Sequence, residues 1–233
     1  MGDQLDARRA THIAIFGRKG SGKSVLARRF WESYPFDRLV IDPTGDVDPG
    51  DPKARNLSTP LPHRWPMKVD RRERITLRYA PDPGSATYEE DLDRAAGLAF
   101  SHGHCLLWVD EIGELTSANR TPPAMRRILH QSRHRSLSTL FCGPRPIDIN
   151  PLVINQADYI AIFHLPNPAD RKRVADNMGY ELAELEEAHD ELVEHGYLWW
   201  DAVNRELEVR PPIPHGRTRK SLEERFEPPP RRH

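Results

Sequence analysis

Gly17-Arg18-Lys19-Gly20-Ser21-Gly22-Lys23-Ser24 is the stretch that decides the fold. It matches the pattern G-x-x-x-x-G-K-[ST] of phosphate-binding loops. The apolar run His12 to Phe16 precedes it and a segment with helical character, Val25 to Ser33, follows it. This is the strand and helix context that such a loop requires. We therefore predict a nucleotide-binding site, against the alternative of a glycine-rich turn that binds nothing.

The residue types of this loop suit a triphosphate. Three glycines lack a Cβ atom, so successive backbone N–H groups can point at one phosphate. The Lys23 ammonium can reach the β- and γ-phosphates, and the Ser24 hydroxyl can ligate Mg²⁺. The predicted cofactors are thus ATP and Mg²⁺. The predicted nucleotide-binding residues are Gly17, Arg18, Lys19, Gly20, Ser21, Gly22, Lys23, Ser24 and Val25.

Two carboxylates follow the apolar run Leu106 to Val109. Asp110, at the end of a predicted strand, can hold Mg²⁺ through its water shell. Glu111 faces differently and can orient or deprotonate a water that attacks the γ-phosphate. This second carboxylate favours hydrolysis over transfer of the phosphate to another substrate. The alternative is a strand that ends in a solvated acidic turn.

Phosphate hydrolysis also needs a positive charge at the γ-phosphate, from the same chain or from a neighbour. The sequence leaves several candidates open: Arg126, Arg127, Arg133, Arg135 and Arg145.

Strands and helices alternate along the chain, which predicts an α/β fold with a mostly parallel central sheet flanked by helices. The expected strands are residues 12–16, 38–41, 75–79, 105–109, 137–142 and 159–163, and the last two strand-like pieces, 196–200 and 206–209, have hairpin spacing. The expected domains are a polar lead-in over 1–10, an ATPase domain over 11–210 and a Pro- and Arg-rich tail over 211–233. Within the ATPase domain, the proline-rich segment 47–74 is expected to be an irregular surface insertion that does not pair as a central strand.

Composition excludes some classes of protein. The 233 residues hold 34 basic and 35 acidic side chains, so no global basic field indicates nucleic acid, and any such contact needs a local patch. The two cysteines lie in apolar segments and are predicted to be buried thiols, which suits a reducing compartment. No apolar stretch has membrane-spanning length and the N-terminal residues lack a signal-peptide core, so we expect a cytoplasmic protein.

Several stretches, in their order along the chain, resemble the HerA/FtsK superfamily of ring-forming ATPases that pump DNA. They are the loop at 17–24, Val40-Ile41-Asp42-Pro43-Thr44-Gly45-Asp46, Val109-Asp110-Glu111, and Arg133 leading to Phe141-Cys142-Gly143-Pro144-Arg145-Pro146. The resemblance spans about residues 10 to 210. It is greatest to the small genome-packaging ATPases of viruses.

The resemblance implies a RecA-like P-loop fold, phosphate contacts from Lys23 and Ser24, metal coordination by Asp110 and catalysis by Glu111. It places Arg133 where the family has its intersubunit arginine finger. It also implies a homo-oligomeric ring, perhaps a hexamer, that acts on double-stranded DNA, with viral capsid or membrane-vertex proteins as further partners. One departure is Pro144, which stands where the family has a sensing glutamine.

The predicted function is therefore an ATP-hydrolysing DNA translocase, as in genome packaging, located in the host cytoplasm or with the virion. The leading alternative is an ATP-binding regulatory switch or assembly factor that does no work on DNA. A small-molecule kinase is a third possibility, against which the paired carboxylates count.

Overall fold

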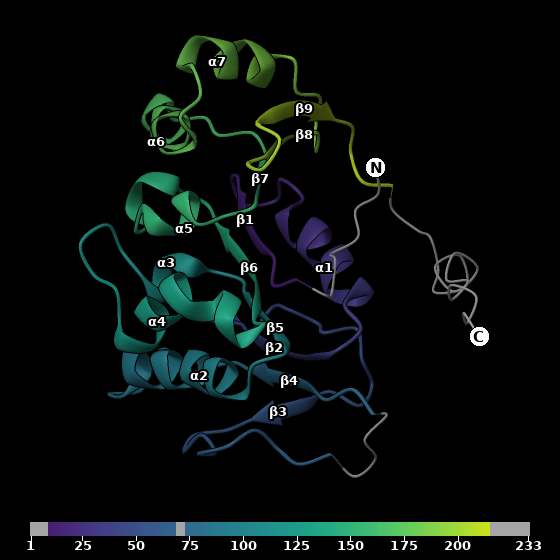
Figure 1. Cartoon of the computed structure of the whole chain (residues 1–233), viewed down its shortest axis with the longest axis vertical. Helices are drawn as coiled ribbons and strands as arrows, with labels where there is room; N and C mark the ends of the chain where they lie inside the picture. Colours follow the sequence, from purple (N-terminus) through teal and green to yellow (C-terminus); the bar gives the residue numbers. More distant parts are fainter. Residues whose placement is uncertain (1–8, 69–72, 215–233) are drawn as a thin grey trace.

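A computed structural model describes residues 9–68 and 73–214 of the chain. A mostly parallel sheet runs through these residues, with nine strands in the order β3-β4-β2-β5-β6-β1-β7-β8-β9 (Figure 1). The strands are β1 (His12–Phe16), β2 (Asp37–Ile41), β3 (Arg55–Leu57), β4 (Thr76–Tyr79), β5 (Cys105–Val109), β6 (Ser138–Gly143), β7 (Tyr159–Ile162), β8 (Tyr197–Asp201) and β9 (Glu206–Arg210). The predicted α/β fold is confirmed.

The strands from β1 to β7 pair in parallel, and β8 and β9 close one side of the sheet as an antiparallel hairpin. The register aligns the ends of the central strands, because Phe16 lies opposite Gly143 and Ile41 lies opposite Val109. The residues that follow these strands therefore share the carboxyl edge of the sheet, where open α/β sheets bind their ligands.

Helices cover both faces of the sheet (Figure 1). One face carries α2 (Tyr88–His102), α3 (Ile112–Leu115), α4 (Pro123–Gln131) and α5 (Leu152–Asn155), and the opposite face carries α1 (Lys23–Ser33). The helices α6 (Pro168–Met178) and α7 (Leu182–Asp190) lie toward the β8–β9 end. No helix of the described residues is long and apolar enough to cross a membrane.

Side-chain alternation divides the core into two layers. Ala14 and Phe16 pack on the face of α2 and α4, whereas Ile13 and Ile15 pack on the face of α1. Every residue of β1, β2, β5 and β6 is buried, as expected for parallel strands covered on both sides. Both cysteines are buried and unpaired within these strands.

The insertion over 47–74 differs from its prediction in one respect. It contains the short strand β3, which pairs in parallel with β4 and forms an edge of the sheet. An edge position tolerates the flanking prolines, because only one side of the strand must pair. Residues 69–72 of this insertion lie outside the described part, as do residues 1–8 of the predicted lead-in and 215–233 of the predicted tail.

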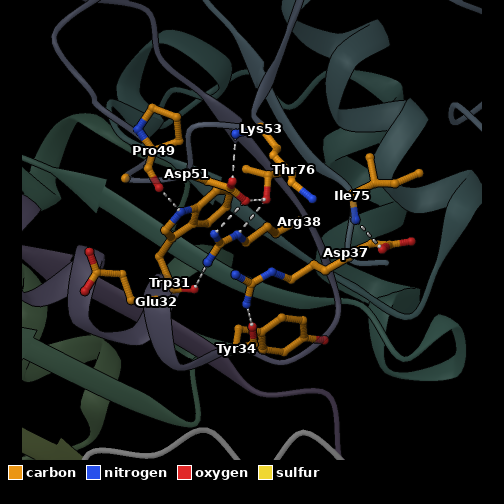
Figure 2. Close-up of polar contacts among 12 residues, drawn as sticks. Trp31, Glu32, Tyr34, Asp37, Arg38, Pro49, Asp51, Lys53, Ile75 and Thr76 are labelled. Carbon is orange, nitrogen blue, oxygen red and sulfur yellow. Dashed lines mark hydrogen bonds and ion pairs between the residues drawn. The ribbon is translucent and has the colours of Figure 1, made fainter. Parts of the chain in front are cut away.

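A buried arginine fixes the start of the insertion (Figure 2). Arg38, with an exposed fraction of 2%, donates to the backbone oxygen of Trp31 and to Thr76, and its guanidinium pairs with Asp51 at 3.4 Å. The same guanidinium lies over the Trp31 ring, 4.6 Å from its centroid, and the indole N–H donates to the carbonyl of Pro49. The insertion is therefore attached both to the end of α1 and to the sheet.

Candidate nucleotide-binding site

The loop 17–24 leaves β1 at the carboxyl edge and turns directly into α1. Its backbone is tied to both neighbouring strands, because Gly17 N–H donates to Gly143 O and Arg18 N–H donates to His164 O, each at 3.3 Å. The Lys23 ammonium folds back over the loop and donates to Gly17 O at 2.7 Å and to Arg18 O at 3.1 Å. The loop is thus closed around its own lysine.

Close packing requires glycine at the first position of the loop. A Cβ atom on Gly17 would lie 2.5 Å from Phe163 Cβ and 2.8 Å from Ser21 Oγ. Gly22 lies against the Phe163 ring, with a φ of 108°. Phe163 follows β7 and is fully buried, so it forms a rigid floor beneath the loop. This contact was not predicted, because an apolar residue after a strand carries no distinctive signal.

The hydroxyl of Ser24 and the carboxylate of Asp110 meet at this edge, with Ser24 Oγ 3.4 Å from Asp110 Oδ1. The two predicted halves of the site, the loop and the acidic strand end, therefore lie together. Two oxygen donors side by side fit Mg²⁺, which prefers carboxylate, hydroxyl and water ligands. Burial raises the pKa of Asp110, and the nearby carboxylate of Asp42 raises it further, while Lys23 lowers it.

Glu111 is the second acid of this strand end and begins α3 as its N-cap residue. Burial raises its pKa to about 7, against the opposing effect of the Lys23 ammonium. A carboxylate with a pKa near neutrality can both accept and release a proton, as a general base must. Burial also lowers the pKa of Lys23, with Glu111 and Asp110 among the groups that oppose this shift.

Asp42 supports the site from the neighbouring strand β2. It is fully buried, and its carboxylate accepts the backbone N–H groups of Gly45 and Val47 and the guanidinium of Arg78. These hydrogen bonds hold the turn beside Asp110 in shape. They also occupy the carboxylate oxygens of Asp42, which therefore have little capacity left to bind a ligand. The turn residues Asp-Pro-Thr-Gly-Asp after a strand were a visible signal for this position.

The candidate arginines do not converge on the loop. Arg133 lies in the 3₁₀ turn Ser132–Arg135, and its guanidinium is 3.0 Å from Asp158, at the amino ends of the strands. Arg145 lies on the carboxyl edge and pairs with Asp148 and Asp170, each at 3.5 Å. Arg135 donates to backbone oxygens at the end of α2, and Arg126 and Arg127 are exposed on α4.

Two cavities flank the loop on the side of β7. One, of about 380 Å³, is lined by Arg18, Lys19, Gly20, Ser21, His164 and residues 192–196. The other, of about 310 Å³, is lined by Gly20, Gly22, Lys23, Ser24, Val25, Phe163, His195 and Ile213. His195 borders both, and its Nδ1 lies 3.3 Å from the carbonyl oxygen of Ser21. Sequence reasoning missed His195 and Ile213, because they lie far along the chain from the loop and in no motif.

No protein-family model matches the chain, and no curated protein sequence matches it. Among solved structures, the genome-packaging NTPase B204 from Sulfolobus turreted icosahedral virus 2, in complex with ATP-gammaS, is similar with a TM-score of 0.68 and 21% identity. The match covers 90% of this chain and 100% of that one. The complex of the same NTPase with AMP gives a TM-score of 0.64 at 21% identity, with 91% and 100% of the chains covered.

B204 from Sulfolobus Turreted Icosahedral Virus, described as a DNA-packaging ATPase, gives a TM-score of 0.64 at 22% identity, with 87% of this chain and 98% of that chain covered. At this identity the likeness establishes the fold. The chain has a P-loop NTPase fold like that of B204, and the predicted resemblance to small viral packaging ATPases is confirmed at that level.

Proposed function

We propose that this protein is an ATPase that packages a genome by moving double-stranded DNA, and that it works as a homo-oligomeric ring. One observation carries the proposal: the phosphate-binding loop and the paired acids Asp110 and Glu111 meet at one edge of the sheet, with Ser24 Oγ 3.4 Å from Asp110 Oδ1. Solved structures of similar fold include genome-packaging NTPases, one of them in complex with ATP-gammaS.

The loop residues would bind and orient the triphosphate. The Lys23 ammonium, which now donates to two loop carbonyls, can turn to the β- and γ-phosphates without leaving the site. Ser24 and Asp110 would hold Mg²⁺, which neutralises phosphate charge when bound with the nucleotide. The backbone N–H groups at the start of α1 add the positive end of the helix dipole.

Glu111 would position the attacking water and take its proton. Its side chain lies beside Gly143 and Gly113, whose missing side chains leave room next to the carboxylate. The pKa of about 7 means that a large share of Glu111 is ionised at neutral pH, as a base must be. The second carboxylate beside Asp110 is the feature that favours hydrolysis over transfer to a second substrate.

Arg133 would serve a neighbouring subunit, because it lies at the opposite edge of the sheet from its own loop. A residue supplied in this way implies head-to-tail contacts between subunits, which form a ring when the rotation from one subunit to the next closes. DNA would pass through the ring by contacts with its phosphates, which are blind to sequence and weaken with salt. Capsid or membrane-vertex proteins are the further partners that we expect, in the host cytoplasm or the virion.

The test is to compare ATP binding and hydrolysis in the wild-type protein, Lys23→Ala and Glu111→Gln, with and without double-stranded DNA over a salt series. We expect Lys23→Ala to lose nucleotide binding, and Glu111→Gln to bind ATP but hydrolyse it at least about 100-fold more slowly. DNA should stimulate the wild-type rate, less so as salt rises. Hydrolysis by Glu111→Gln at the wild-type rate would contradict the role of Glu111.

One observation favours an alternative, a nucleotide-dependent switch or assembly factor. Pro144 follows Gly143 at the end of β6, where the resembling family has a sensing glutamine, and it has no polar side chain. The next candidate, Arg145, is already paired with Asp148 and Asp170. A hydrolysis rate that DNA does not change would support the switch.

A further inference from the structure

The segment 211–214 leaves β9 and returns to the phosphate-binding loop. Ile213 of this segment is half-buried against the core layer of α1, and it lines the 310 Å³ cavity together with Val25 and Phe163. The chain beyond the last strand thus contributes a wall to a cavity that also contains Lys23 and Ser24.

The strand order shows which part of a nucleotide this cavity would hold. β5, with Asp110 and Glu111 after it, lies two strands from β1 on one side, and β7 lies next to β1 on the other. The terminal phosphate must face the acids for hydrolysis. The nucleoside must then extend from the loop in the opposite direction, toward β7, where Val25, Phe163 and Ile213 surround the cavity.

The lining of the cavity suits a flat ring held by packing. Val25 has an exposed fraction of 38%, so its methyl groups can contact a ligand, whereas Phe163 is buried and closes the floor of the cavity. Among the described lining residues, the side chains with polar atoms are Lys23 and Ser24 at the phosphate end and His195. A volume of about 310 Å³ lies within the range of small-ligand sites.

His195 has limited capacity to read a base. Its Nδ1–H donates to the Ser21 carbonyl, which can only accept, and its Nε2 lies 3.8 Å from a carboxylate oxygen of Glu194, so both ring nitrogens already face groups of the protein. No described lining residue of this cavity has a carboxylate or amide side chain, the side-chain groups that distinguish the hydrogen-bonding edges of adenine and guanine. The nearest such group is the carboxylate of Glu194, which lines the neighbouring 380 Å³ cavity.

The sequence Pro211-Pro212-Ile213-Pro214 makes the wall stiff. Each proline ring fixes its own φ angle, and Pro214 restricts Ile213 to extended conformations. Ile213 is therefore held in place before any ligand arrives, and contact with it costs little conformational entropy.

We propose that the segment 211–214 forms the outer wall of the nucleoside site, where Ile213 packs on the base and ribose, and that this site discriminates little between adenine and guanine nucleotides. The inference rests on the proposed nucleotide binding by the loop 17–24. It assigns part of the affinity for the nucleotide to Ile213, a residue outside the phosphate-binding motif.

The experiment measures the affinities of ADP, GDP and inorganic tripolyphosphate by calorimetry for the full chain and two variants, Ile213→Ala and Val209→Ala. Val209 is the matched control, since it lies on β9 with an exposed fraction of 46% and is not a lining residue of the cavity. We expect Ile213→Ala to weaken ADP and GDP roughly tenfold, as the loss of partly buried methyl and methylene groups implies. Its affinity for tripolyphosphate should equal that of the wild type, and Val209→Ala should change none of the three.

Several results would overturn the inference. If Ile213→Ala bound ADP with the same affinity as the wild type, the segment would not touch the nucleoside. If the variant lost as much affinity for tripolyphosphate as for ADP, the substitution would disturb the loop instead. If the affinities of the wild-type protein for ADP and GDP differed by more than about tenfold, the site would not be one that discriminates little between the two bases. Wild-type protein that binds neither ADP nor tripolyphosphate would overturn the proposed function as well.

Discussion

The carboxylate of Asp158 holds Arg133 at the amino ends of the strands, with Arg133 Nη2 3.0 Å from Asp158 Oδ1. The other carboxylate oxygen accepts the backbone N–H of His12, and the His12 ring is in turn hydrogen-bonded to Ser132. β1 has five residues, so the Cα atoms at its two ends are about 13 Å apart. Arg133 therefore cannot serve the loop of its own chain without a large rearrangement.

Mixing two variants that we expect to be slow tests whether sites are shared between subunits. Arg133→Ala retains Glu111, and Glu111→Gln retains Arg133, so a mixed ring of the proposed kind would contain some sites with both residues intact. We expect each variant alone to hydrolyse ATP slowly and the mixture to recover part of the rate, measured as phosphate release. Arg127→Ala, which removes an exposed arginine of α4, is the control and should remain active. A mixture no faster than its components would argue for an arginine in the same chain.

The rate of hydrolysis should depend on the ionisation of Glu111. Burial raises its pKa to about 7. Because only the ionised form accepts a proton, kcat/KM should fall about tenfold per pH unit below this pKa and level off above about pH 8. ATP binding by Glu111→Gln over the same pH range separates this effect from titration of the nucleotide. A flat profile between pH 6 and 8 would contradict the role of Glu111 as a base.

Glu111 should also lower the stability of the fold. A carboxyl with a pKa of about 7 in the folded state and an ordinary pKa in the unfolded state binds more protons when folded. The free energy of unfolding therefore decreases as pH rises from about 4.5 through 7. We expect Glu111→Gln to be more stable than the wild type at pH 8 by roughly 1–2 kcal/mol, and equally stable at pH 4.5. Urea denaturation at both pH values measures the difference. If Glu111→Gln were less stable than the wild type at pH 8, the folded protein would stabilise the ionised carboxylate of Glu111.

The attachment of the insertion predicts a contrast between two aspartates. Asp51→Ala leaves the buried Arg38 guanidinium without its carboxylate and removes the acceptor of the Thr76 hydroxyl. This should lower the free energy of unfolding by about 3 kcal/mol. Asp48→Ala breaks the pair with Arg28, in which both side chains are exposed, and should cost less than about 1 kcal/mol. If urea denaturation showed the same loss of unfolding free energy for both variants, the contacts of Arg38 with Asp51 and Thr76 would contribute little to stability.

The sequence predicted the parts of the fold and of the site that follow local rules. A phosphate-binding loop requires a particular strand and helix, and buried parallel strands have continuous apolar runs, so β1, β5 and β6 could be located from their residues alone. The meeting of Ser24 with Asp110 followed from the rule that ligands bind at the carboxyl ends of parallel strands. The roles of these residues stay predictions.

Other features depend on contacts between distant segments. β3 is only three residues long and lies among prolines, so its pairing with β4 is decided by the anchored turn before it. His195 and Ile213 reach the loop because β8 and β9 return the chain to β7. The partner of Arg133 is Asp158, a pairing set by the sheet order, which no spacing along the chain reveals.

Helix α1 has a further consequence for how the molecule can respond to a ligand. It starts in the phosphate-binding loop and is 11 residues long, and its last turn holds the insertion through Trp31 and Arg38. A rod of this kind, about 16 Å long, is stiff, so a tilt at one end moves the other. A change in the tilt of α1 on nucleotide binding would therefore displace the start of the insertion as well.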